Sequence, residues 1–123
     1  MTTTAASRQA LGAYGEAIAA RMLTNERGML LLDRNWRCPE GELDLVLRDG
    51  DVLVACEVKT RRGDGSGSPH QAVDTVRLER LHRLVWRWAE ERGVRPEEVR
   101  VDLVAVLRPR RGAAIVDHVE GLV

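Results

Sequence analysis

The chain contains a single lysine among nineteen basic side chains, and its neighbours are residues that could do chemistry. Lys59 stands two positions after Glu57, and Asp44 lies thirteen residues before that glutamate. Lysine carries a compact ammonium, whereas arginine carries a wide guanidinium fork that stays charged. A bias towards arginine codons does not explain why one position kept an ammonium. The isolated Lys59 beside a glutamate therefore indicates a chemical task.

Asp44 and Glu57 are expected on the two strands of one hairpin. The turn signal Asp49-Gly50-Asp51 separates two alternating segments. With Asp49-Gly50 at the centre of the turn, Asp44 should face Ala55, one diagonal step from Glu57. Two carboxylates this close repel one another unless a cation lies between them. Oxygen ligands with open positions favour Mg²⁺ or Mn²⁺.

Lys59 is expected on the same side of its strand as Glu57, roughly 6–7 Å further along. An ammonium there could orient an attacking water or stabilise the charge that develops on a phosphorane. Phosphodiester cleavage needs a metal that polarises the phosphate and activates water, and a cation that meets the growing negative charge. The residues therefore predict a metal-dependent site for phosphodiester hydrolysis. The simpler interpretation is a solvated strand face with an ion pair between Glu57 and Lys59.

The elements that position these side chains follow from apolar spacing and turn residues. The spacing predicts a helix over 9–25, strands over 29–32, 42–48 and 52–60, a helix from 68 to 91 or 92, and strands over 99–107 and 114–119. Residues 35–41 and 61–67 are expected as loops. The second helix should begin at the Ser68 cap, with Pro69 at its first position and Gln71 in the capping box. The order is α-β-β-β-α-β-β, a mixed sheet flanked by helices.

Alternation in the hairpin predicts which side chains share a face. In the first strand, one face should carry Leu43, Leu45 and Leu47, and the other Glu42, Asp44 and Val46. In the second strand, one face should carry Val52, Val54, Cys56 and Val58, and the other Leu53, Ala55, Glu57 and Lys59. The core stripe of the second helix is expected at Val73, Leu81, Leu84, Val85 and Trp88, which leaves Trp86 exposed.

Length and composition exclude several classes of protein. The 123 residues fit one domain over 9–123 behind a disordered tail at 1–8. The formal net charge of zero removes the usual argument for a nucleic-acid binder, although a local basic face can still exist. Cys38 and Cys56 lack zinc spacing and fit reduced cysteines of a cytoplasmic protein. We expect no membrane span and no signal peptide, because no apolar run is long enough.

Four short motifs in combination resemble a known family. They are Gly15-Glu16, Asn35-Trp36-Arg37, Gly41-Glu42-Leu43-Asp44-Leu45 and Glu57-Val58-Lys59-Thr60-Arg61. Together they resemble the YraN-like uncharacterised bacterial proteins. Those proteins are similar to the restriction-endonuclease-like, PD-(D/E)xK superfamily, and in pattern to archaeal Holliday-junction resolvases. The resemblance extends from about Leu11 to Leu107.

The resemblance implies an α/β fold of the restriction-endonuclease type, with a single nuclease-like domain. It implies that Asp44 and Glu57 bind Mg²⁺ or Mn²⁺ and that Lys59 is the catalytic lysine. Glu16 would complete the acidic cluster, although a solvated helical carboxylate is an equal alternative. The carbonyl of Val58 would be a further ligand. The resemblance to resolvases suggests a homodimer.

The chain departs from the superfamily pattern at two points. Leu43 stands where the eponymous proline would precede Asp44, a position that is often degenerate. The second helix usually carries a lysine or glutamine near the site, and Arg77 and Arg80 are the nearest equivalents. Arginine can contact phosphate with two donors but is a poor proton acceptor. Arg61 and Arg62 are further candidates for contacts to a nucleic-acid backbone, with a solvated linker as the alternative.

The leading hypothesis is a Mg²⁺-dependent nuclease that hydrolyses phosphodiester bonds in DNA, with branched or damaged structures as candidate substrates. The alternative is a catalytically silent module of the same fold that binds nucleic acid or assists another protein. Zero net charge and the missing helical lysine favour that alternative. A purely structural interaction domain, with Trp86 at its interface, is the third hypothesis.

Overall fold

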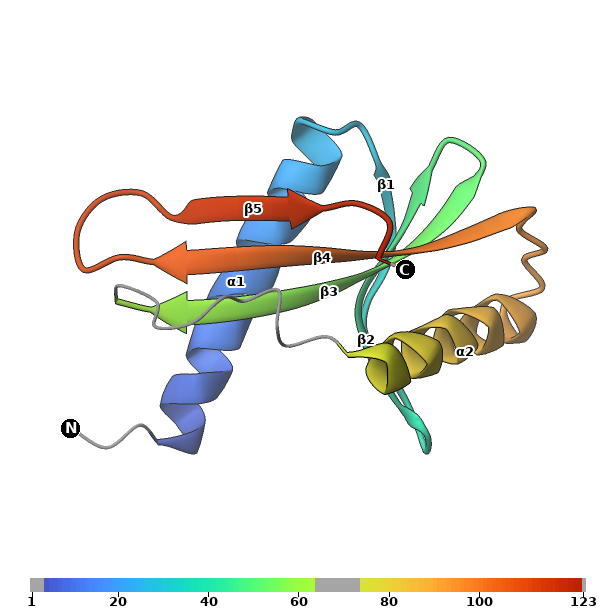
Figure 1. Cartoon of the computed structure of the whole chain (residues 1–123), viewed down its shortest axis with the longest axis horizontal. Coiled ribbons are helices and arrows are strands. Elements are labelled where there is room, and N and C mark those ends of the chain that lie inside the picture. Colours follow the sequence, from blue (N-terminus) through green and yellow to red (C-terminus); the bar gives the residue numbers. More distant parts are fainter. Residues whose placement is uncertain (1–3, 64–73, 123) are drawn as a thin grey trace.

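The computed structural model of the chain describes residues 4–63 and 74–122. Its elements follow the predicted order α-β-β-β-α-β-β, which is therefore confirmed (Figure 1). They are α1 (Ala5–Asn25), β1 (Leu30–Cys38), β2 (Gly41–Asp49), β3 (Val52–Arg62), α2 (Thr75–Glu91), β4 (Glu98–Arg108) and β5 (Ile115–Val119).

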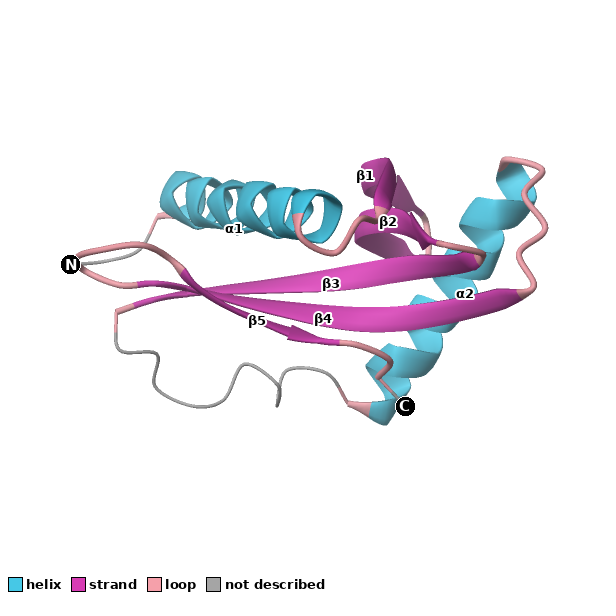
Figure 2. Ribbon diagram, turned by 90° about the horizontal axis from the view of Figure 1, so that it is seen from above, coloured by secondary structure: helices cyan, strands magenta, loops and turns pink. Residues whose placement is uncertain are grey.

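The strands form one mixed sheet in the order β1-β2-β3-β4-β5. β3 and β4 are parallel, and the other neighbouring pairs are antiparallel. Parallel neighbours need a long crossover connection, and α2 lies within it. α1 covers one face of the sheet and α2 the other (Figure 2). The predicted α/β architecture, a mixed sheet flanked by helices, is confirmed.

Each helix has its own apolar layer. The layer under α1 contains Ala19, Leu23, Leu45, Leu47, Val54, Cys56 and Val58, and the layer under α2 contains Leu43, Val46, Leu53, Ala55, Leu81, Val85 and Trp88. The alternation predicted for β3 is confirmed. The prediction for β2 is wrong at Leu43, which packs under α2 while Leu45 and Leu47 pack under α1.

Leu43 changes face because β2 separates from β3. The last backbone pair between the two strands on that side is Leu45 with Cys56. Beyond it, the β1–β2 hairpin continues alone and its tip reaches α2 (Figure 1). Gly41 makes this contact with φ +153, and a Cβ there would lie 3.2 Å from Leu84 Cδ1. β2 and β3 therefore diverge beyond Leu45 and Cys56, between the two helices. We call this point of divergence the fork.

The register of the β2–β3 hairpin differs from the prediction. Asp49 pairs with Val52, so the turn is Gly50-Asp51 rather than Asp49-Gly50, and Gly50 adopts φ +61. Asp49 remains in its strand, where its carboxylate accepts a hydrogen bond from Arg100 at 3.0 Å. Ala55 consequently pairs with Val46 and not with Asp44.

The prediction of a loop over 35–41 is also wrong. β1 runs through Cys38 and turns only at Pro39-Glu40. A register shift between Leu31 and Asp33, together with φ +53 at Asn35, interrupts the alternation by which a strand is recognised. The two ends of the loop predicted over 61–67 differ in outcome: Arg61 and Arg62 belong to β3, and residues 64–67 lie outside the described residues.

Both helices begin at residues other than those predicted. α1 starts at Ala5, because the Thr4 hydroxyl caps it by accepting from the Ser7 amide. α2 starts at Thr75 behind an extended Asp74, whose carboxylate accepts from the Arg77 amide. The predicted Ser68 cap and Val73 lie outside the described residues. The rest of the predicted stripe, Leu81, Leu84, Val85 and Trp88, is buried, and Trp86 is 48% exposed as expected.

Neither helix in the described part of the chain is long and apolar enough to cross a membrane.

A buried ionic cluster, which the sequence analysis did not identify, joins β4, β5 and the C-terminal segment. Asp102 is fully buried, and its carboxylate accepts hydrogen bonds from Arg100 and from the Gly121 amide, each at 2.9 Å. His118 Nε2 lies 2.9 Å from the same carboxylate. Burial alone would raise the pKa of Asp102, but these hydrogen bonds outweigh it and hold the pKa below its ordinary value. His118 thus has a structural role.

We expect Asp102→Asn to lower the free energy of unfolding at pH 7 by roughly 1–3 kcal/mol, because the buried donors of Arg100 and His118 then lose their charged acceptor while Arg100 keeps Asp49 and Glu120. A carboxyl whose pKa is lowered by folding stabilises the protein above its unfolded pKa, near 4, and this stability is lost as the pH falls through the folded pKa. Urea unfolding at pH 7 and again between pH 4 and pH 2 checks this. The gap between wild type and variant should narrow in acid, and a constant gap would contradict the role assigned to Asp102.

Candidate active site

The fork between β2 and β3 places Asp44 beside Glu57. In the register of the hairpin, the step after Leu45 and Cys56 would pair Asp44 with Glu57. The strands separate there, and the Val58 amide donates to Asp44 Oδ2 at 2.9 Å. A carboxylate therefore takes up a strand N–H at the point where the ladder stops. The predicted proximity of Asp44 and Glu57 is produced by this bond, and not by the diagonal pairing expected from the sequence.

Glu57 is a buried carboxylate that contacts two cationic side chains. It is 5% exposed, and its Oε1 accepts a hydrogen bond from an Arg77 terminal nitrogen at 2.5 Å. Lys59 Nζ lies 3.5 Å from the same oxygen. Arg77 comes from the first turn of α2, so the N-cap at Asp74 fixes where this guanidinium enters the site. The Nε atom of Arg77 is buried without a hydrogen-bond partner among the described residues.

Asp44 differs from Glu57 because no described basic side chain forms an ion pair with it. Burial and the negative charge of Glu57 raise the pKa of Asp44 to about 7, although the Val58 hydrogen bond opposes the shift. The negative charges of Glu16 and Glu42 raise it further. Asp44 is therefore the carboxylate of the site whose charge has no ion-pair partner among the described residues.

Glu16 reaches the fork from α1, and Gly15 is what allows it. A Cβ on Gly15 would lie 1.8 Å from Thr60 Oγ1, so only glycine permits α1 to approach β3 this closely. Burial raises the pKa of Glu16, while a hydrogen bond with the Asn35 side chain and the charge of Arg34 lower it. Asn35 has the left-handed backbone that asparagine tolerates. The motifs Gly15-Glu16 and Asn35-Trp36-Arg37 therefore meet in space.

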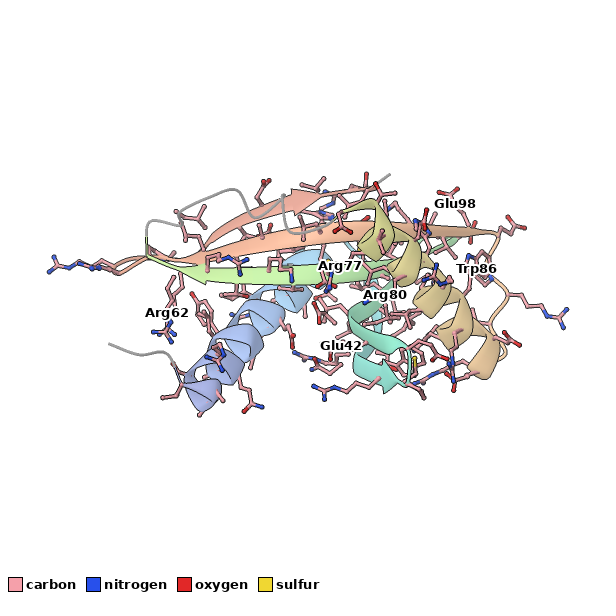
Figure 3. The ribbon with its side chains drawn as sticks, turned by 60° about the horizontal axis from the view of Figure 1, so that its bottom comes forward. Glu42, Arg62, Arg77, Arg80, Trp86 and Glu98 are labelled. Carbon is pink, nitrogen blue, oxygen red and sulfur yellow. The ribbon has the colours of Figure 1, made fainter. Side chains whose placement is uncertain are left out.

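The remaining predicted residues are divided between two places. Arg77, predicted as a nucleic-acid contact, lies in the site on Glu57. Arg80 is exposed one turn along α2, beside a hollow of about 270 Å³ that it shares with Glu40 and Arg87. Arg77, Arg80 and Glu42 surround the space between the two helices, whereas Arg62 lies towards one end of the molecule, away from Trp86 (Figure 3).

The oxygen donors of the site are of the type that a hard divalent cation prefers, but their side chains are not gathered around one point. Carboxylate and carbonyl oxygens are the ligands that Mg²⁺ and Mn²⁺ prefer. Within residues 4–63 and 74–122, however, no three His, Cys, Asp or Glu side chains gather closely enough to hold a metal ion. The Arg77 guanidinium occupies one oxygen, Oε1, of the Glu57 carboxylate. A cation would therefore compete with Arg77 for Glu57.

Comparison with known proteins identifies one family. The model described as "Uncharacterised protein family UPF0102" matches residues 15–106, a span that includes every residue of the fork. A "UPF0102 protein" from Nocardioides sp. is 58% identical over 124 residues and covers 99% of both chains. Another from Kineococcus radiotolerans is 54% identical over 117 residues, which is 94% of this chain and 95% of the relative.

The close approach of α1 to β3 makes a prediction about two glycines of the same helix. Gly15→Ala should destabilise the protein by roughly 1–3 kcal/mol, because the added methyl overlaps Thr60 and pushes the helix away. Gly12→Ala is the matched control: nothing lies within 4 Å of its Cβ, so the better helix propensity of alanine should stabilise by up to about 1 kcal/mol. Urea unfolding followed by circular dichroism measures both, and equal effects would contradict the close contact.

Proposed function

The chain belongs to the UPF0102 family, and we propose that it is a divalent-metal-dependent nuclease that hydrolyses phosphodiester bonds in DNA. The observation that carries the proposal is the fork, where Asp44 and Glu57 lie together with Lys59 adjacent. Two neighbouring carboxylates, one of them without a cationic partner among the described residues, are the charge arrangement that a hard cation relieves.

Each residue of the fork has a role in this proposal. Asp44 and Glu57, with Glu16 and the Val58 carbonyl as further donors, would hold Mg²⁺ or Mn²⁺, which supplies polarisation of the phosphate and an activated water. Lys59 lies on the same strand as Glu57, and its ammonium orients the attacking water or stabilises negative charge on the phosphorane. These three, Asp44, Glu57 and Lys59, are the proposed catalytic residues.

Arg77 supports the same reaction through its unused donor. One terminal nitrogen binds Glu57, while Nε is buried and has no partner among the described residues. A guanidinium can offer two parallel N–H donors to a phosphate. When Arg77 leaves Glu57, its guanidinium can therefore donate two hydrogen bonds to a non-bridging oxygen of the substrate phosphate.

The proposed substrate is DNA that is recognised by its backbone and shape. No element for reading bases is identified among the described residues, and backbone contacts carry no sequence information. Arg80 on α2 and Arg61 and Arg62 at the end of β3 are exposed and are the proposed contacts. Branched or damaged DNA is the proposed structural class, and a homodimer would present two sites to two strands.

A silent nucleic-acid-binding or accessory module is the second candidate. The observation that favours it is the Arg77–Glu57 ion pair, which neutralises Glu57 without any metal. Such a protein would bind DNA and cut nothing, and its affinity would not depend on Asp44 or on a divalent cation.

Competition between Arg77 and a cation can be measured directly. Arg77→Met should tighten Mn²⁺ binding by roughly fivefold, because a partly exposed ion pair contributes up to about 1 kcal/mol. Arg80→Met, one turn further on the same helix and exposed, should leave the affinity unchanged. Titration calorimetry with Mn²⁺ alone is the measurement. Weaker binding in Arg77→Met would show that this arginine organises the site instead of competing for it.

The nuclease proposal is tested by cutting assays with Mg²⁺ and with Mn²⁺ on a panel of linear, branched and damaged DNA. Lys59→Ala and Asp44→Asn should each lower the rate by about 10²–10³-fold, since each removes a charge from the reacting centre. Asp51→Asn, in an exposed turn, is the control carboxylate and should cut normally. Undiminished cutting by Lys59→Ala would refute the role of that lysine. DNA binding without cutting would identify the silent module.

A further inference from the structure

The C-terminal ends of the parallel strands β3 and β4, and the turn after β4, are rich in arginine. We call Arg61, Arg62, Arg108, Arg110 and Arg111 the arginine rim. The pairing of β3 with β4 places Arg62 opposite Arg108, and the Gly63 amide donates to the Arg108 carbonyl at 3.1 Å. All five side chains are exposed. Two strands and the turn after β4 therefore gather these charges at one end of the sheet.

The rim groups five positive charges in a chain whose formal net charge is zero. None of the five forms an ion pair with a carboxylate of the described residues. Six other arginines do form such pairs: Arg27, Arg37, Arg77, Arg87, Arg92 and Arg100. Grouping like charges costs free energy through self-repulsion, and a bound polyanion removes that cost. The rim differs from other arginines without an ion pair by its grouping, because five positive charges lie together at one end of the sheet, where a bound anion would relieve their repulsion.

Two rim side chains are held by their surroundings. The Arg108 guanidinium carbon lies 4.7 Å from the centroid of the Tyr14 ring, a cation–π contact with α1. Arg61 donates to the Thr60 carbonyl at 3.2 Å. These contacts limit the freedom of the side chains while leaving donors available to an incoming group. Ordering before binding reduces the entropy lost on binding.

One rim residue, Arg61, continues the line of the candidate active site along β3, whereas Arg62 and Arg108 lie on the opposite face, where Arg108 contacts Tyr14 of α1. Glu57, Lys59 and Arg61 are alternate residues of one strand and share a face, so each step is roughly 6–7 Å. An anion that lies over Lys59 therefore meets Arg61 next. An anionic membrane surface would also suit five arginines, but it gives no reason for the rim to extend from the strand that carries the fork.

We propose that the arginine rim binds the phosphate backbone of the nucleic acid strand that enters the fork. Guanidinium forks match phosphate with two donors, and exposed arginines that contact phosphates add affinity without reading sequence. The identity of the bound strand as substrate rests on the proposed nuclease function, whereas the binding itself does not. Arg108, Arg110 and Arg111 are thereby added to the contacts expected from the sequence.

Fluorescence anisotropy with a labelled DNA duplex, in EDTA and over a series of salt concentrations, tests the proposal. The double variants Arg61→Ser/Arg62→Ser and Arg110→Ser/Arg111→Ser should each flatten the slope of log affinity against log salt by about one per arginine removed. Arg48→Ser/Arg95→Ser removes the same charge at the opposite end of the sheet, where Arg48 pairs with Leu53, and should leave the slope unchanged. Thermal unfolding verifies that all variants fold.

The outcomes separate the rim from the fork. If rim variants keep the wild-type slope, or lose binding only to vesicles of anionic phospholipid, the proposal is overturned, whether or not the protein cuts DNA. If the slope of log affinity against log salt flattens in the rim variants while the protein cuts no substrate on the panel, the rim binds nucleic acid and the nuclease proposal fails. Equal loss of slope in the control variant would mean that net charge, and not the rim, drives binding, which also overturns the proposal.

Discussion

The hydrogen bond from the Val58 amide to Asp44 is the constraint on which the candidate site depends. A strand that loses its partner exposes an amide that must be satisfied, and burying it unpaired would cost free energy. At this position the satisfying group is a carboxylate, which brings a negative charge beside Glu57. The bond therefore serves the fold by ending the ladder, and it serves the site by fixing an acidic pair. Gly41 and Gly15 permit the two backbone approaches that surround it.

The fully buried Asp102 and the partly buried Asp44 differ in how their negative charges are compensated. Asp102 accepts hydrogen bonds from Arg100 and Gly121 and lies against His118, and its pKa is lowered although burial opposes this. Asp44 receives one amide and lies beside another carboxylate, and its pKa is raised to about 7. A structural acid is compensated by its neighbours. An acid whose neighbours raise the free energy of its ionised form is a candidate for function, because the fold tolerates a charge that a bound ligand could neutralise.

The parts predicted from the sequence are those that rest on local patterns. Alternation in β3 correctly placed Leu53 and Ala55 opposite Val54 and Cys56, and the order of elements followed from helical and strand periods. The hairpin register was missed because it depends on Asp49 staying in its strand, where Arg100, fifty-one residues away, holds its carboxylate. Leu43 was misplaced because strand divergence is a tertiary event. The Asn35 contact with Glu16 and the Asp102 cluster join distant segments, and no spacing along the chain reports them.

The formal net charge of zero does not describe the local surface of this protein, because positive and negative side chains gather in different places. Carboxylates gather at the fork, with Asp44, Glu57, Glu16 and Glu42 within mutual influence, while the rim arginines gather at the end of β3 and β4. A sum over the chain cancels the two. For a polyanion, however, only the local field matters within about one Debye length, near 8 Å at physiological salt. The proposed nucleic acid strand would meet the rim as a cationic surface and the fork as an acidic one, where Arg77 is bound to Glu57.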